Sequence, residues 1–114
     1  MSELSRKKCV PCEGGVLPLT KPRAEALLKE LSEGWMLVDG ASMLAKHFHF
    51  KDFKETMAFV NSVAALAEEE GHHPDMTVSY ADVGIELMTH AIGGLSENDF
   101  ILAAKIDEIH YKHG

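Results

Sequence analysis

The sequence has little of what a membrane, secreted or nucleic-acid-binding protein requires. No apolar run in its 114 residues approaches the ~20 residues that span a bilayer. The N-terminal residues 1–8 are polar and lack the apolar core of a secretory signal, so we expect a cytoplasmic protein with no membrane partner. Its 11 basic and 18 acidic side chains leave a net charge of −7. We expect no nucleic-acid partner, because such a partner requires a basic face.

The chain has only two cysteines, Cys9 and Cys12, which form a Cys-Val-Pro-Cys pair followed by Gly14-Gly15. This pattern resembles half of a zinc knuckle or a redox pair. The chain has no second such pair, so a zinc site would need histidines or another subunit to complete it. The simpler interpretation is an arm that carries two reduced thiols. Because residues 1–19 show no periodicity, we predict an N-terminal arm at 1–19 and one domain at 20–114, which is long enough to bury a core.

Three stretches have the spacing of amphipathic helices. They begin at Thr20, Asp52 and Ser96, whose side chains can cap a first turn, and the first two are predicted to end at Gly34 and Gly71. The apolar stripe of the second helix is predicted to consist of Phe53, Met57, Val60, Ala64 and Ala67.

Two pairs of short apolar segments predict β-hairpins. Residues 35–38 and 43–50 flank an Asp-Gly turn, and residues 76–80 and 83–89 flank Ala81-Asp82. The alternation along the last segment directs its apolar residues toward the helices and His90 toward the open face. The element order α-β-β-α-β-β-α predicts an α+β fold, with a four-stranded antiparallel sheet and three helices packed on one face.

Histidines and a carboxylate gather at the ends of these predicted elements. His72 and His73 follow the second helix, His90 ends a strand-like run, and Asp99 lies in the first turn of the third helix. Imidazole has an unperturbed pKa near neutrality, so such a group can supply a base and an acid at pH 7 without a cofactor. This chemistry suits a reaction that adds or removes water.

Each of these residues also has a purely structural explanation. A histidine after a helix C-terminus is favoured by the helix dipole, and Asp99 can complete a capping box with Ser96. Three histidines and a carboxylate could bind zinc, but adjacent histidines after a helix lack the usual ligand spacing, so we expect no metal. His47 and His49 do have the ligand spacing of a strand, but the sequence offers them no partner.

The ordered set of Glu68, His72-His73-Pro74, Tyr80, His90 and Asp99 resembles the signature of the pterin-4a-carbinolamine dehydratases in identity and spacing. Further matches are Gly34-Trp35, Phe48-x-Phe50-x-x-Phe53, Gly93-Gly94-Leu95-Ser96 and Asp99-Phe100-x-Leu102-Ala103, and the resemblance covers residues 18–112. One position departs from the pattern, because Ala91 stands where the family usually has an acidic residue.

The resemblance implies a fold, an activity and residue roles. Family members dehydrate 4a-hydroxytetrahydropterin to quinonoid dihydropterin, which recycles the cofactor of aromatic amino-acid hydroxylases without a metal or organic cofactor. The implied catalytic residues are His72, His73 and His90, with His72 and His90 as the acid/base pair and His73 orienting the pterin. The implied substrate-binding residues are Glu68, Pro74, Thr89 and Asp99.

The resemblance also implies partners and leaves alternatives open. Family members form homodimers or homotetramers, so we expect a homo-oligomer. The Cys9-x-x-Cys12 arm resembles a subgroup for which a link to molybdenum-cofactor enzymes has been suggested, so a pterin-binding protein of that metabolism is one alternative. A non-catalytic dimerisation or transcriptional cofactor is the other, because animal relatives have such a role.

Overall fold

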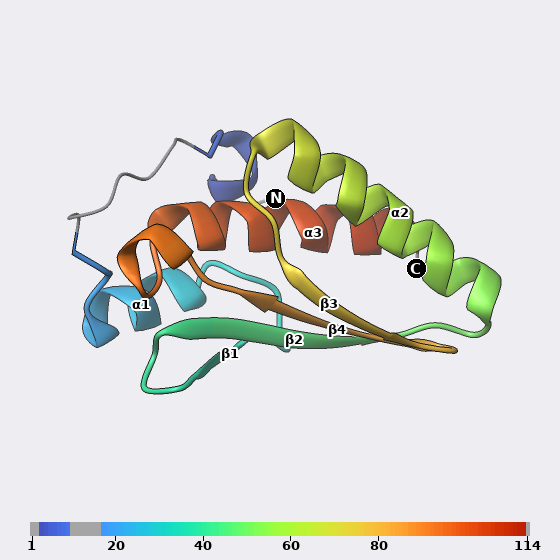
Figure 1. The fold of residues 1–114 in the computed structure, drawn as a ribbon, viewed down its shortest axis with the longest axis horizontal. Helices are drawn as coiled ribbons and strands as arrows, with labels where there is room; N and C mark the ends of the chain where they lie inside the picture. The colour runs from blue at the N-terminus through green and yellow to red at the C-terminus, as the bar shows by residue number, and fades with distance from the viewer. Residues whose placement is uncertain (1–2, 10–16, 114) are drawn as a thin grey trace.

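The predicted α+β fold is confirmed by the computed structural model, which describes residues 3–9 and 17–113 (Figure 1). Cys12 lies outside the described residues. Among the helices of the described residues, none combines the length and the apolarity that a membrane crossing requires. The elements are, in order, the 3₁₀ turn η1 (Leu4–Arg6), α1 (Lys21–Leu28), β1 (Met36–Val38), β2 (Met43–His49), α2 (Phe53–Glu70), β3 (Asp75–Ser79), β4 (Asp82–Leu87), the 3₁₀ turn η2 (His90–Ile92) and α3 (Glu97–His113).

The two predicted hairpins join into one antiparallel sheet in the order β1-β2-β4-β3. The central pair aligns Leu44 with Leu87 and Phe48 with Val83, so apolar side chains of β2 and β4 share one face and are buried under the helices. The predicted inward direction of Val83, Ile85 and Leu87 is therefore confirmed. The predicted direction of His90 along this strand is not, because His90 lies in turn η2, beyond the end of β4. β4 ends at Leu87, two residues before the predicted end, and Thr89 forms an isolated bridge with Gly94 instead.

The predicted starts of the first two helices are confirmed by their caps. The side chain of Thr20 accepts from the backbone N–H of Arg23 at 3.3 Å, and that of Asp52 accepts from Glu55 at 2.9 Å. The predicted end of the first helix was wrong, because α1 ends at Leu28 instead of Gly34. The next residues form tight turns, with Leu31 N–H donating to Leu28 O at 3.1 Å, and these carry the chain toward β1.

The predicted stripe of α2 was wrong for most of its residues, although Ala67 is buried and Val60 packs against the core. The buried side chains of α2 are Thr56, Phe59, Val63 and Ala67, and only Ala67 belongs to the predicted set. Phe53 is 51% exposed. The physical reason is an aromatic cluster. The ring centroid of Phe59 lies 4.9 Å from that of Phe48 and 5.0 Å from that of Phe50. These contacts rotate α2 so that Phe59, which the predicted stripe omits, faces the sheet.

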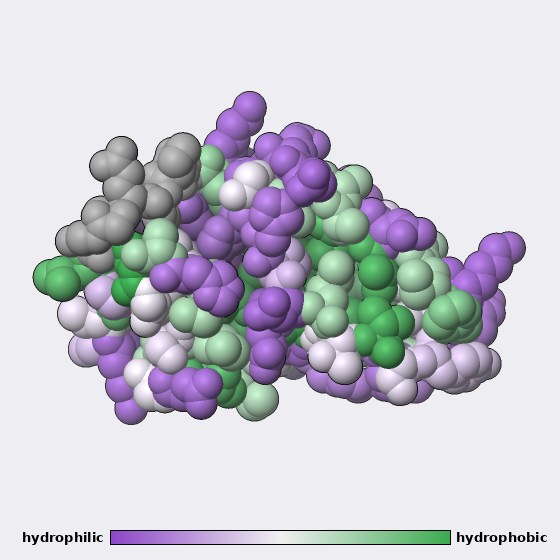
Figure 2. Space-filling model, viewed as in Figure 1, coloured by the Kyte–Doolittle hydropathy of each residue, from purple (hydrophilic) through white to green (hydrophobic). Residues whose placement is uncertain are grey.

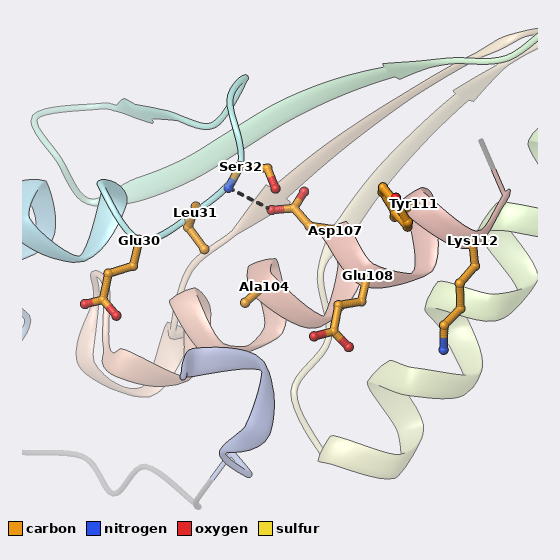
Figure 3. A pocket seen from close by; sticks show the side chains of 8 residues that line it. All are labelled: Glu30, Leu31, Ser32, Ala104, Asp107, Glu108, Tyr111 and Lys112. Carbon is orange, nitrogen blue, oxygen red and sulfur yellow. Dashed lines mark hydrogen bonds between the residues drawn. The ribbon is translucent and has the colours of Figure 1, made fainter. Parts of the chain in front are cut away.

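A buried polar group ties the first hairpin to α3. The Asp107 carboxylate accepts from the indole N–H of Trp35 at 2.9 Å and from the Lys46 ammonium at 2.8 Å. Figure 3 shows its further hydrogen bond from the backbone N–H of Ser32. The Lys46 and Asp107 side chains are only 9% and 10% exposed, so each depends on the other to offset the cost of leaving water.

Replacing Asp107 by Ala is therefore expected to destabilise the fold by about 3–5 kcal/mol, because the Lys46 charge is left buried and unpaired. The measurement is the free energy of unfolding from urea titrations of the two proteins. The neighbouring substitution Glu108→Ala is the control and is expected to cost less than about 1 kcal/mol. Equal losses in the two variants would contradict the structural role of Asp107.

Candidate functional site

A hollow of about 350 Å³ lies where the end of α2, the segment after β4 and the start of α3 meet. The structure thus brings together the three histidines that the sequence singled out, although they come from two separate segments. The lining residues are Cys9, Glu70, Gly71, His72, His73, Met88, Thr89, His90, Ala91 and Asn98.

The end of α2 directs His72 toward α3. Gly71 adopts the left-handed conformation with φ of 65°, and the His72 N–H donates back to Ala67 O at 3.2 Å. The His72 Nε2 atom then lies 2.6 Å from Oδ1 of Asp99, and the two side chains are 13% and 0% exposed. Because a carboxylate only accepts, Nε2 of a neutral His72 carries the hydrogen, and Nδ1 is left as its basic nitrogen.

The Asp99 carboxylate is held from its other oxygen as well. Its Oδ2 accepts from the Thr89 hydroxyl at 2.9 Å and from the backbone N–H of Ser96 at 2.9 Å. The hydroxyl of Ser96 lies 2.7 Å from that of Thr89 and donates to it, because the Thr89 hydrogen is engaged with Asp99. Asp99 therefore makes one half of the predicted capping box and also holds His72.

The second histidine lies in a more open position. His73 Nε2 lies 2.5 Å from Oε2 of Glu68, and the two side chains are 60% and 79% exposed. A pair so exposed is screened by water and contributes little to stability. Glu68 reaches the hollow through His73, and neither Glu68 nor Pro74 is among the described residues that line it.

His90 is positioned by the bridge that follows β4. Thr89 N–H donates to Gly94 O at 2.8 Å, and the residues between them form the short turn η2. Gly93 closes this turn with a left-handed φ of 67°. His90 begins the turn and is exposed, so its ring is available to a molecule in the hollow.

Six lining residues were not among the predicted site residues: Cys9, Glu70, Gly71, Met88, Ala91 and Asn98. Asn98 directly precedes Asp99, and Glu70 lies two residues before His72. Nearness in sequence to the predicted site residues was therefore a signal that could have found both. Cys9 carried no such signal, because it comes from the predicted N-terminal arm. Its backbone N–H donates to Oε1 of Glu70 at 2.9 Å across 61 residues of sequence.

A larger hollow of about 600 Å³ lies between the turn that follows α1 and α3 (Figure 3). Its lining includes Glu30, Asp107 and Tyr111, and none of the described residues that line it is a histidine. Asp107 is already engaged with Trp35 and Lys46. The smaller hollow is therefore the better candidate, because it alone of the two gathers groups that can exchange protons near neutral pH.

His47 and His49 find a partner that the sequence did not reveal. One ring nitrogen of each lies 2.9 Å from Oδ1 of Asp82 on the exposed sheet face. The hydrogen bond from His49 lowers the pKa of Asp82 below its ordinary value, and the charge of His47 adds to this. Within residues 3–9 and 17–113, no group of three or more potential ligands has an arrangement that could hold a metal ion.

Comparisons with known proteins agree on one family. The family model of pterin 4 alpha carbinolamine dehydratase matches residues 17–109. A protein of Nitrosomonas eutropha, provisionally named a pterin-4-alpha-carbinolamine dehydratase, is 56% identical over 105 residues, which cover 92% of this chain and 91% of that protein. A protein of Rickettsia bellii with the same provisional name is 53% identical over 104 residues, which cover 91% of each chain.

Solved structures give the same result for the fold. The crystal structure of a transcriptional coactivator/pterin dehydratase from Brucella melitensis has a TM-score of 0.76 and 35% identity, and the match covers 81% of this chain and 97% of that one. A pterin dehydratase-like protein described as a RuBisCO assembly factor in the alpha-carboxysome has a TM-score of 0.60 and 31% identity. The match covers 68% of this chain and 89% of that one.

Because the Thr89 hydroxyl donates to buried Asp99, we expect Thr89→Val to destabilise the protein by about 1–3 kcal/mol, the cost of an unsatisfied buried acceptor. The shapes of Thr and Val are similar, so little packing changes. Thr77→Val, on the exposed edge strand β3, is the matched control and should change stability by less than about 0.5 kcal/mol. Urea unfolding of both variants measures the difference, and equal effects would refute the role of this hydroxyl.

Proposed function

The chain belongs to the pterin 4 alpha carbinolamine dehydratase family, and from this premise we propose that it dehydrates 4a-hydroxytetrahydropterin to quinonoid dihydropterin. One observation carries the proposal. The hollow gathers His72, His73 and His90, and the buried carboxylate of Asp99 lies directly behind His72. A reaction that removes water needs a base and an acid close together, and this group supplies both.

The proposed reaction moves two protons and breaks one bond. A base takes the proton from N5 of the pterin, an acid donates a proton to the 4a-hydroxyl, and the C4a–O bond breaks to release water. The electron pair of the N5–H bond becomes the new N5–C4a double bond. We assign these proton transfers to His72 and His90, which line the hollow from two separate segments, the end of α2 and the turn after β4.

The remaining residues have supporting roles in this proposal. His73 orients the pterin, and Glu68 orients His73 through the contact between their side chains. Thr89 lines the hollow, whereas Asp99 lies behind His72 and fixes its ring. We assign the ring-lining role of Pro74 to its position directly after His73. No metal or organic cofactor enters this mechanism, and the reaction would recycle the cofactor of aromatic amino-acid hydroxylases.

A second candidate is pterin binding without turnover, in molybdenum-cofactor metabolism or as a dimerisation or transcriptional cofactor. One specific observation favours it. Ala91 lines the hollow at the position where the family usually has an acidic residue, so the pocket lacks one group that could orient a pterin or tune a histidine.

The two candidates are separated by the decay of chemically generated 4a-hydroxytetrahydropterin, followed by ultraviolet absorbance. We expect the protein to accelerate the decay, and His72→Ala and His90→Ala each to reduce kcat by about 10²-fold or more, since general acid/base groups contribute 10²–10⁴-fold. His47→Ala and His49→Ala, on the exposed sheet face, are the controls and should retain full activity.

The other outcomes of this assay are equally informative. Full activity in both His72→Ala and His90→Ala would refute their assignment as the acid/base pair. A folded wild type that leaves the decay unchanged, but binds 7,8-dihydropterin in calorimetry, would favour binding without turnover.

We also propose that the chain forms a homodimer or homotetramer. Strand β3 is an edge of the sheet, and its Val78 is exposed, as is Phe53 at the start of α2. Figure 2 shows apolar side chains gathered between α2 and the β3–β4 hairpin. An edge strand beside an apolar surface favours pairing with a second copy.

Light scattering at micromolar concentration is expected to give a mass of two or four chains. Val78→Lys places a charge on the edge strand and is expected to shift the protein toward the monomer. Glu33→Lys, in the exposed turn between α1 and β1, is the control and should leave the mass unchanged. A monomeric wild type would contradict the proposal.

A further inference from the structure

The N-terminal segment of the protein reaches the histidine hollow, although sequence patterns gave it no part in the site. We propose that residues 4–9, the wall segment, form a fixed wall of the pterin pocket, and that Glu70 is the positioning residue that holds this wall. The inference rests on the proposed function, because it assigns substrate affinity within the same pocket. It extends that function by naming what sets the affinity for the pterin.

The wall segment is fixed at three points. Leu4 is buried and belongs to the hydrophobic core, and the turn η1 packs on α3 near the end of α2 (Figure 1). The Lys7 ammonium pairs with Glu97 at 3.1 Å, although this exposed pair is the weakest of the three attachments. The backbone N–H of Cys9 donates to Oε1 of Glu70 at 2.9 Å. Three attachments along six residues make this segment part of the folded domain.

Glu70 is the attachment closest to the chemistry. Its other carboxylate oxygen pairs with Lys105 at 3.3 Å, and its side chain is only 5% exposed. Burial alone would raise the pKa of Glu70, but the hydrogen bond from Cys9 N–H and the Lys105 charge outweigh it, so the pKa lies below its ordinary value. A charged Glu70 thus links the wall segment, α3 and the end of α2, which leads directly to Gly71 and His72.

Cys9 presents a contact surface to the hollow. Its thiol lies 3.6 Å from the backbone oxygen of Asn98, and both residues line the hollow. Burial and the nearby Glu70 carboxylate raise the pKa of Cys9 to about 12. At neutral pH the residue is therefore a neutral thiol, which packs like a small apolar group and is a poor nucleophile.

The role assigned to the wall is therefore binding. The orientation of His72 is set by its own contact with Asp99, and His90 is placed by the turn after β4. Loss of the wall should weaken pterin binding and leave the proton transfers intact. The expected signature is a rise in KM with kcat preserved, which is the kinetic result of losing uniform binding.

Adjacent glutamates at the end of α2 allow a matched test. Glu69 is exposed, whereas Glu70 holds the wall segment. Glu70→Ala is expected to raise KM about tenfold and to change kcat less than twofold, the effect of losing about one hydrogen bond to a charged group. Glu70→Gln keeps an acceptor for Cys9 N–H and should restore most of the affinity. Glu69→Ala should match the wild type in both constants.

A second pair of variants keeps the test valid if Glu70→Ala fails to fold. Cys9→Phe would fill part of the hollow, whereas Lys8→Phe places the same ring on an exposed neighbour. Calorimetry with 7,8-dihydropterin, which needs no turnover, is expected to give at least tenfold weaker binding for Cys9→Phe and unchanged binding for Lys8→Phe.

The outcomes separate this inference from the proposed function. Weaker binding of 7,8-dihydropterin by Cys9→Phe supports the inference that the wall segment lines the pocket, whether or not the wild type has dehydratase activity. Suppose instead that the wild type is active and that Glu70→Ala and Cys9→Phe keep its KM and its binding of 7,8-dihydropterin. That result would refute the inference that residues 4–9 form a pocket wall, and it would leave the proposed dehydratase function supported. A loss of kcat in folded Glu70→Ala without a change in KM would also refute that inference.

Discussion

The buried carboxylate of Asp99 is the interaction on which the site depends. It receives hydrogen bonds from the Thr89 hydroxyl after β4, from the Ser96 backbone at the start of α3, and from His72 at the end of α2. A buried carboxylate is costly unless its oxygens are satisfied. The three segments must therefore meet here for the protein to be stable, and the same meeting point creates the hollow. Stability and site geometry have one cause.

The hollow has a rigid side and an open side. On the rigid side, His72 is nearly buried and is fixed by Asp99, and Glu70 is buried against Lys105. On the open side, His73 and His90 are exposed. This division suits a dehydration, because one base must hold its orientation while the released water needs a path to solvent.

The fold was predictable where the signal was local. Strand alternation depends only on neighbouring residues, so the inward face of β4 was predicted correctly. The stripe of α2 was not, because the position of Phe59 depends on tilted ring contacts with Phe48 in β2 and Phe50 just after it. The histidines were found from their places at element ends. Cys9 was not, because its contact with Glu70 forms only when the N-terminal segment packs on the completed helices.

The run Glu68-Glu69-Glu70 shows why residue type alone could not assign the carboxylates of the site. The family signature includes Glu68, which the structure places in an exposed pair with His73. The most buried member is Glu70, which has the Cys9 N–H and the Lys105 ammonium as partners. Adjacent positions on a helix point in different directions, so one faces solvent and another faces packed segments. Tertiary contacts therefore decide which carboxylate pairs with an exposed histidine and which is buried beside the hollow.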